Sequence, residues 1–132
     1  MNETEIVADA SAILAALKNE PFGEVDPREL VGVAISAVNL CEVLSKLQDD
    51  GLSEAQADAA VSAMDLSVVA FDEPQARAAA RLRPLTRHAG LSLGDRACLA
   101  LGLRLDSTVI TADRAWASLD TGVEVVLIRQ AL

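Results

Sequence analysis

Short apolar runs alternate with longer stretches of helical character along this chain, and this alternation limits the possible folds more than any other feature. Each run is apolar at nearly every position, which is typical of parallel strands covered on both faces and not of half-exposed antiparallel strands. The pattern therefore predicts an α/β fold around a central parallel sheet. The predicted strands are residues 6–8, 30–35, 68–71, 108–111 and 123–128.

The stretches between these runs carry apolar residues at helical spacing and residues that commonly begin or end helices. Ser11 and Ser36 are predicted to cap the first two helices, and Gly51 is predicted to end the second one. Pro84 marks a kink or an end in a later helix. The predicted helices include residues 13–17, 37–50, 53–64, 73–88 and 92–103, with a short helix around Trp116.

The length and composition favour a single globular domain over residues 1–132. Hydrophobic residues make up 52% of the 132-residue chain, and no repeat or linker divides it. The chain has neither an uninterrupted apolar stretch long enough to cross a membrane nor the start of a signal peptide, so we expect a cytoplasmic protein without a membrane partner. Cys41 and Cys98 lie in apolar surroundings without CxxC spacing, which predicts two buried, reduced thiols.

The formal net charge of −9 argues against broad neutralisation of nucleic-acid phosphates. Divalent cations held by clustered acids would, however, reverse the sign of the charge locally. The positive charge is also uneven, because most of the arginines lie in the C-terminal half. Four of them are candidates for RNA contact, with a merely solvated helix face as the alternative: Arg77, Arg81, Arg87 and Arg96.

Two acidic residues follow predicted strands directly. Asp9 comes after the first strand and Asp113 comes shortly after the strand 108–111. The carboxyl ends of parallel strands share one edge of the sheet, so these carboxylates converge if the two strands are neighbours. Asp95 lies in the first turn of a helix, where capping alone explains an acid. Glu42 has apolar neighbours, so its carboxylate needs either a cation or a solvated position on the helix edge.

A cluster of carboxylates without a suitably spaced histidine suits Mg²⁺ or Mn²⁺ better than structural zinc. Such cations polarise a phosphodiester, activate water and stabilise the leaving oxygen. Asp9, Glu42, Asp95 and Asp113 are then candidate metal ligands and catalytic residues, one of which could accept a proton. Ser11 and Thr111 are placed to orient ligands or waters, although capping explains Ser11 equally well.

Four segments in this order resemble PIN-domain proteins, especially the VapC-type toxins of bacterial toxin–antitoxin pairs: VADASAIL, SAVNLCEVLSKL, LSLGDRACLALGLRL and TVITADRAW. The resemblance spans nearly the whole chain. It implies a PIN-like three-layer α/β/α fold with a mainly parallel sheet. It also implies endoribonuclease activity dependent on Mg²⁺ or Mn²⁺, a homodimer, and inhibition by a cognate antitoxin protein.

Carried over by motif, the resemblance assigns the four acids named above to the site, with Ser11 and Thr111 as the matching hydroxyl positions. Asn39 precedes Glu42 by three residues, and it either bonds into the site or is a polar surface residue. The high apolar content suggests a surface covered by a second copy or by a partner helix. We expect that groove on the helices 37–50 and 53–64, with Leu44 and Leu47 in it.

Two other classes of function compete with a ribonuclease. An aspartate-dependent phosphatase would use Asp9 as its nucleophile, but its pattern needs a second aspartate where this chain has Ser11. A catalytically inactive PIN-fold interaction module would be expected to lack one of the four acids, and none is missing. Neither glycine-rich phosphate-binding motif, GxGxxG or GxxxxGK[ST], occurs in the sequence.

Overall fold

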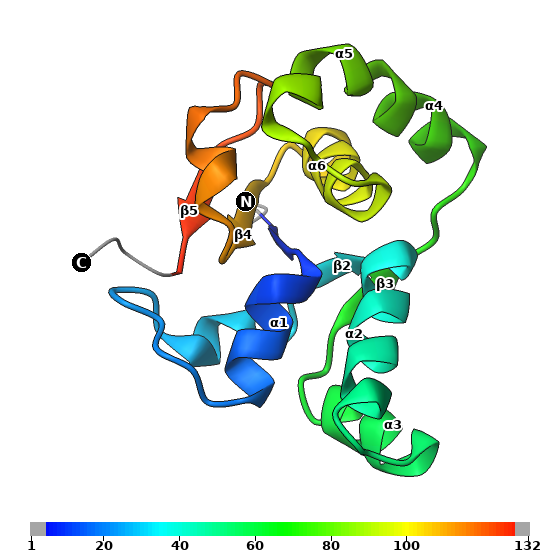
Figure 1. The fold of residues 1–132 in the computed structure, drawn as a ribbon, viewed down its shortest axis with the longest axis vertical. Helices are drawn as coiled ribbons and strands as arrows, with labels where there is room; N and C mark the ends of the chain where they lie inside the picture. The colour runs from blue at the N-terminus through cyan, green and yellow to red at the C-terminus, as the bar shows by residue number, and fades with distance from the viewer. Residues whose placement is uncertain (1–4, 129–132) are drawn as a thin grey trace.

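The computed structural model describes residues 5–128, and its strands form one five-stranded parallel sheet in the order β3-β2-β1-β4-β5 (Figure 1). The predicted parallel sheet is thereby confirmed. Val7 of β1 pairs with Ala34 of β2 on one side and with Val109 of β4 on the other, so β1 is the central strand. The strands are β1 Ile6–Ala8, β2 Ala34–Ser36, β3 Ser67–Val69, β4 Thr108–Thr111 and β5 Val125–Leu127.

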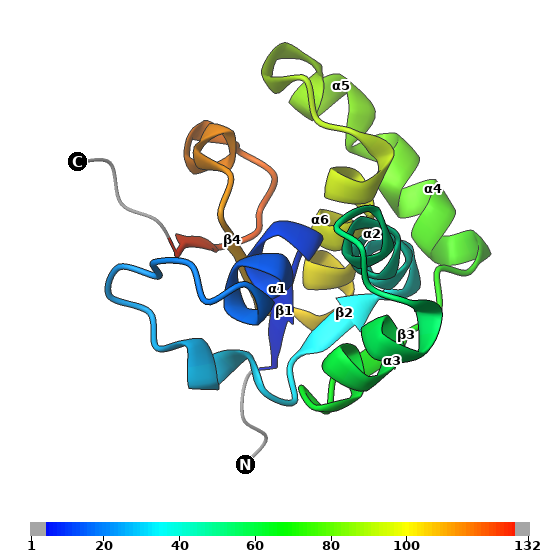
Figure 2. The ribbon, with the colours of Figure 1, turned by 60° about the horizontal axis from the view of Figure 1, so that its bottom comes forward.

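Helices lie on both faces of the sheet and give the fold the three α/β/α layers that the sequence predicts. One face is covered by α1 and α2, with α3 packed on α2, and the other by α4 and α6, as Figure 2 shows from a second direction. The helices are α1 Ala10–Leu17, α2 Ala37–Asp49, α3 Glu54–Ser62, α4 Glu73–Arg81, α5 Arg83–Thr86 and α6 Leu93–Leu105. The 3₁₀ turns are η1 Pro27–Leu30, η2 Arg87–Ala89 and η3 Arg114–Ser118.

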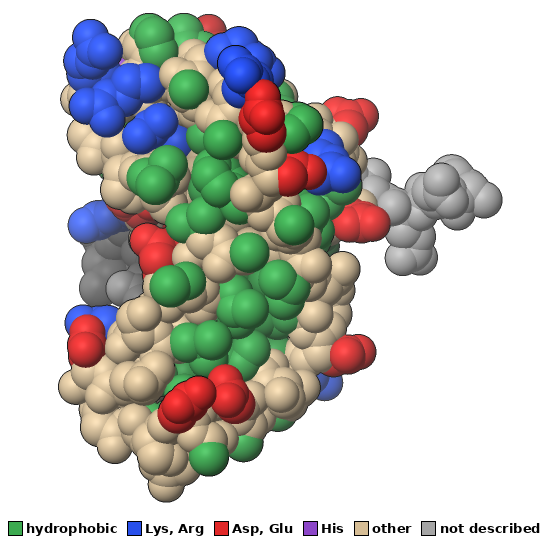
Figure 3. All heavy atoms as spheres, turned by 90° about the vertical axis from the view of Figure 1, so that its right-hand side faces the viewer, with side chains coloured by type: hydrophobic (Ala, Val, Ile, Leu, Met, Phe, Trp, Pro, Cys, Tyr) green, Lys and Arg blue, Asp and Glu red, His purple; other side chains and the backbone are tan. Residues whose placement is uncertain are grey.

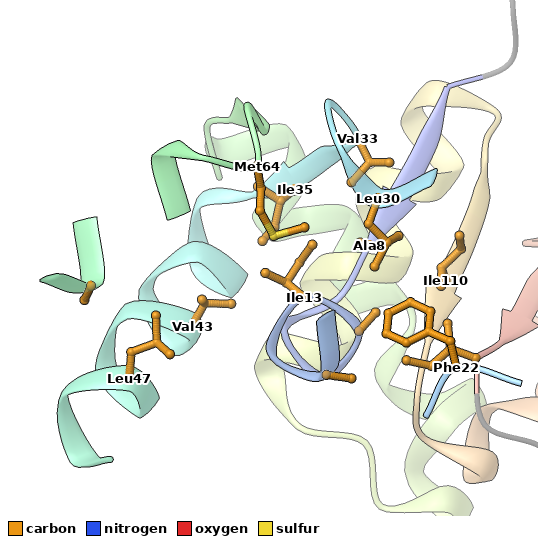
Figure 4. Packing of buried hydrophobic residues seen from close by; sticks show 14 residues of the cluster. Ala8, Ile13, Phe22, Leu30, Val33, Ile35, Val43, Leu47, Met64 and Ile110 are labelled. Carbon is orange, nitrogen blue, oxygen red and sulfur yellow. The ribbon is translucent and has the colours of Figure 1, made fainter. Parts of the chain in front are cut away.

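Each central strand is buried on both faces, which explains its uninterrupted apolar sequence. Successive side chains of a strand point to opposite faces, so neighbouring residues enter different cores. Figure 4 shows the core on the α1–α2 side, where Ile13 and Val43 pack with strand residues. The strand pairs divided between the two cores are Val7 and Ala8, Ala34 and Ile35, and Val109 and Ile110.

Three predictions about burial are wrong. The run 68–71 was expected to form a buried strand, but β3 is an edge strand and Val68 is 48% exposed. Cys41 is exposed because it lies on the outer side of α2, whereas Cys98 is buried as predicted. Leu47 is buried in the core, so the prediction that it lines an open groove is wrong, whereas Leu44 is half-buried and packs against that core.

The helices within residues 5–128 are all too short or too polar to cross a membrane. The longest of them, α2 and α6, have 13 residues each, while a spanning helix needs about 20 apolar residues. Helix α6 is largely buried along its length, because it packs between α2, α4 and the strands β1, β2 and β4. It therefore supports the centre of the sheet.

The burial of α6 predicts unequal effects of one substitution at two nearby positions. Leu101 is fully buried, whereas Leu103 is 41% exposed. Leu101→Ala is expected to lower the free energy of unfolding by about 2–5 kcal/mol through lost contacts and a cavity, and Leu103→Ala by less than about 1 kcal/mol. Urea denaturation followed by circular dichroism measures both, and equal losses would contradict the packing described here.

Candidate functional site

An open cleft of about 290 Å³ lies at the carboxyl ends of the central strands. After β1 the chain builds the sheet outward through β2 and β3, then returns to the other side of β1 as β4. Such a reversal leaves a crevice between the loops that follow the two strands, and ligands commonly bind there. The cleft is lined by Asp9, Ala10, Ser11, Leu14, Asn39, Glu42, Lys46, Asp95 and Asp113. All four predicted acids therefore meet in one place.

Asp9 is the most deeply placed of the four acids, with an exposed fraction of 4%. It directly follows β1 and caps α1, because its Oδ1 accepts the backbone N–H of Ala12 at 2.9 Å. The predicted cap was Ser11, and that prediction is wrong: Ser11 lies in the first turn of α1. Asp9 takes the capping position because its carboxylate reaches the free N–H groups at the start of the helix.

The hydroxyls of Ser11 and Thr111 both donate to the Asp9 carboxylate. Ser11 Oγ lies 2.8 and 2.9 Å from its two oxygens, and Thr111 Oγ1 lies 2.6 Å from Oδ2. Each hydroxyl oxygen also accepts a backbone N–H from the loop after β4, that of Ala112 for Ser11 and that of Asp113 for Thr111. The two hydroxyls thus tie the ends of β1 and β4 together and fix the orientation of Asp9.

Burial raises the pKa of Asp9 from 3.8 to about 6. The hydrogen bonds from Thr111, Ala12 and Ser11 act in the opposite direction, and the charge of Asp95 adds a smaller increase. Burial also raises the pKa of the Cys98 thiol, and the charges of Asp9, Asp95 and Glu42 add to that rise. The cleft therefore places further negative charge beside a buried carboxylate, that of Asp9, and this favours a bound cation.

Glu42 extends from α2 toward the start of α6 and is held there by Asn39. Asn39 is 1% exposed, and its Nδ2 donates to Glu42 Oε1 at 2.8 Å and to the carbonyl oxygen of Gly94 at 3.0 Å. Its Oδ1 is buried without a hydrogen-bond partner. Asn39 is therefore an internal link between α2 and α6, and of the two alternatives for this residue the surface one is wrong.

Gly94 gives the Glu42 carboxylate room to lie against α6. A Cβ atom at position 94 would lie 2.6 Å from both Oε1 and the carboxyl carbon of Glu42, far inside van der Waals contact. Any side chain at this position would displace the carboxylate. This role of Gly94 was not predicted from the sequence, although the glycine directly precedes Asp95 in the LGDR segment.

Asp95 and Asp113 line the cleft while each also accepts a backbone N–H at the start of a helix or turn. Asp95 Oδ2 accepts the backbone N–H of Ser92 at 3.0 Å within a capping box, and Asp113 Oδ1 accepts the N–H of Ala115 at 2.9 Å. The capping interpretation of Asp95 is thus confirmed, and it coexists with a place in the cleft. The second oxygen of each carboxylate is not used by these capping bonds.

The donor set suits a hard divalent cation, because it consists of carboxylate oxygens in an open cleft where water can complete the coordination. The buried Oδ1 of Asn39 adds an acceptor without a partner beside Glu42. In residues 5–128 no three metal-ligating side chains are already arranged around one point. Three of the four acids, Asp9, Asp95 and Asp113, are engaged in capping bonds, so side-chain rotations would have to bring the ligand oxygens around an ion.

The four arginines proposed for RNA contact fall outside the described lining of the cleft. Arg77, Arg81 and Arg87 are exposed, and Arg77 pairs with Glu73 at 2.8 Å. Figure 3 shows basic side chains gathered at one end of the molecule, toward α4 and α5. Arg96 is 9% exposed and donates to the carbonyl oxygen of Ala79, so it stabilises the contact between α4 and α6 and is not placed to reach RNA.

The fold and the cleft define a class of α/β domain that holds clustered carboxylates where the strand order of a parallel sheet reverses. The sequence model of the PIN domain family matches residues 6–122, and the chain belongs to this family. No curated protein sequence matches the chain significantly.

Solved structures of VapBC toxin–antitoxin systems share this fold. DNA-bound VapBC from Salmonella typhimurium has a TM-score of 0.76 at 17% identity and covers 96% of this chain and 100% of its own. VapC20 from Mycobacterium tuberculosis, a sarcin-ricin loop cleaving toxin, has a TM-score of 0.69 at 16% identity, with 88% and 97% covered. VapBC-5 from the same organism is 26% identical, with a TM-score of 0.63 and coverage of 97% and 100%.

The space at Gly94 predicts that Gly94→Ala weakens Mn²⁺ binding by about tenfold or more, because the new methyl group displaces Glu42. The exposed end of Glu42 can swing aside and alanine favours a helix, so unfolding free energy should change by less than about 1 kcal/mol. Titration calorimetry measures the affinity. The double variant with Gly94→Ala and Glu42→Gln should lose no more Mn²⁺ affinity than either single variant. Additive losses of affinity would contradict the role assigned to Gly94.

The raised pKa of Asp9 predicts how the stability of the metal-free protein depends on pH. The folded pKa is about 6 and the unfolded one about 3.9, so the folded state binds more protons between these values. Its free energy of unfolding therefore falls as pH rises through this window, by about 2–3 kcal/mol from this residue. The free energy of unfolding, measured with urea in EDTA, should fall over this pH window in wild type but not in Asp9→Asn. Parallel plots of this free energy against pH for the two proteins would contradict the raised pKa.

Proposed function

We propose that this PIN-domain protein is an endoribonuclease that depends on Mg²⁺ or Mn²⁺ and cleaves RNA phosphodiester bonds with an activated water. One observation carries this proposal: Asp9, Glu42, Asp95 and Asp113 come from four separate segments of the chain and line one cleft. A structural role for acids does not require this convergence, whereas metal-assisted phosphodiester cleavage does.

The four acids are the residues that would hold the cation, which when bound polarises the phosphodiester and lowers the pKa of water. Ser11 and Thr111 keep Asp9 in a fixed orientation, and Asn39 does the same for Glu42. One of the carboxylates accepts the proton of the attacking water. The same acids account for much of the negative charge around the cleft, which bound cations would neutralise so that an RNA strand can approach.

We further propose that the chain is the toxin of a VapBC-type pair, acts in the cytoplasm and has a cognate antitoxin as its protein partner, with a homodimer as its assembly. The structural similarity to VapBC complexes over nearly the full length supports this, and VapBC-5 exceeds one quarter identity. Figure 3 shows hydrophobic side chains in a band on the face that carries α2 and α3, a surface suited to a partner.

Cleavage of total RNA with Mn²⁺ or with EDTA tests the enzymatic proposal. Wild type is expected to cleave only with Mn²⁺, and Asp9→Asn and Asp95→Asn are expected to lose at least about 100-fold in rate. Asp58→Asn on α3 provides a matched control, because it removes an exposed carboxylate outside the described cleft lining and should retain full activity. Cleavage that survives EDTA, or equal rates in all four proteins, would refute the proposal.

A further inference from the structure

The cleft contains one basic side chain among its described lining residues, that of Lys46. It lies on α2, one turn beyond Glu42 and two turns beyond Asn39, and it is exposed. Every other charged residue in this lining is an acid. A lone ammonium group at the rim of a strongly acidic cleft calls for a physical explanation.

The obvious explanation is an ion pair with an acid one turn away on the helix. Lys46 has two such neighbours, Glu42 four residues before it and Asp50 four residues after it, and this spacing favours pairing. Each acid has a closer partner, because Glu42 bonds Asn39 Nδ2 at 2.8 Å and Asp50 pairs with Lys18 Nζ at 2.7 Å. Among residues 5–128, no carboxylate lies within 4.0 Å of the Lys46 ammonium group.

We propose that Lys46 binds a backbone phosphate of RNA next to the phosphodiester held at the carboxylates, and so positions the strand in the cleft. This inference rests on the proposed function. A lysine ammonium group is a compact point charge that binds phosphate without a fixed direction. Asn39 contributes indirectly, since by holding Glu42 toward α6 it leaves Lys46 without its helix partner.

If Lys46 binds phosphate, removing its side chain should affect Mn²⁺ affinity and RNA affinity differently. Removing a positive charge beside the carboxylates should leave Mn²⁺ binding unchanged or tighten it. Loss of a phosphate contact should weaken RNA binding for all sequences alike and reduce its salt dependence. Comparing the Mn²⁺ affinity of Lys46→Ala with its RNA affinity therefore separates a phosphate contact from a role in balancing the charge of the carboxylates.

The test compares Lys46→Ala, Lys46→Arg and Arg28→Ala with wild type. Arg28→Ala is the matched control, because it also removes one positive charge but from an exposed pair with Asp26 outside the described cleft lining. The probe is a labelled pool of random-sequence single-stranded RNA, with Ca²⁺ replacing Mn²⁺ so that the RNA remains intact. Affinity is measured over a range of salt concentrations, and Mn²⁺ binding and Mn²⁺-dependent cleavage of total RNA are measured separately.

Lys46→Ala is expected to bind RNA about three- to tenfold more weakly, with a salt slope lower by about 0.7. Lys46→Arg and Arg28→Ala should resemble wild type, and Mn²⁺ affinity should not fall in Lys46→Ala. If wild type cleaves RNA but Lys46→Ala matches Arg28→Ala in affinity and slope, the Lys46 assignment alone is overturned. If Lys46→Ala loses Mn²⁺ binding, the assignment is also overturned. Absence of Mn²⁺-dependent cleavage by wild type would overturn both proposals.

Discussion

The buried carboxylate of Asp9 is the interaction on which the rest of the cleft depends. It begins α1, and through the hydroxyls of Ser11 and Thr111 it joins the ends of the two central strands. These bonds stabilise the charged form only in part, because the pKa of Asp9 still rises to about 6. Within the described chain no basic side chain forms an ion pair with it. The fold thus holds the Asp9 carboxylate in place without a cationic side chain to neutralise it, and a bound metal ion can take that role.

The other acids in the cleft are positioned by the same local rules that end strands and begin helices. Asp95 and Asp113 reach the cleft because Asp95 lies in the first turn of α6 and Asp113 caps η3, and both elements start at the carboxyl edge of the sheet. Glu42 differs, since it is carried in the first half of α2 and needs both Asn39 and the absent side chain of Gly94 to face the others. Stability and site geometry therefore share residues, and a change that weakens a cap also shifts a carboxylate.

Much of this arrangement could be predicted from the sequence, because apolar runs and strand-end acids are local signals. The parallel sheet, the capping explanation of Asp95 and the convergence of Asp9 with Asp113 follow from such signals. Errors arose where the neighbourhood in space decides the outcome: Val68 lies on an edge strand, and Arg96 points inward to Ala79. The role of Gly94 depends on a contact with Glu42 across 52 positions of the chain, which no local pattern reveals. Lys46 could have been noticed from its spacing to Glu42, although the absence of an ion pair with it among residues 5–128 could not.

The four carboxylates are proposed to form one divalent-cation site. Anomalous X-ray scattering from crystals grown with Mn²⁺ can locate the ion without any assumption about activity. A peak is expected in the cleft at a coordination distance of about 2.0–2.6 Å from oxygens of Asp9 and at least one other of the four acids. Mn²⁺ bound elsewhere on the protein with no peak in this cleft would contradict it.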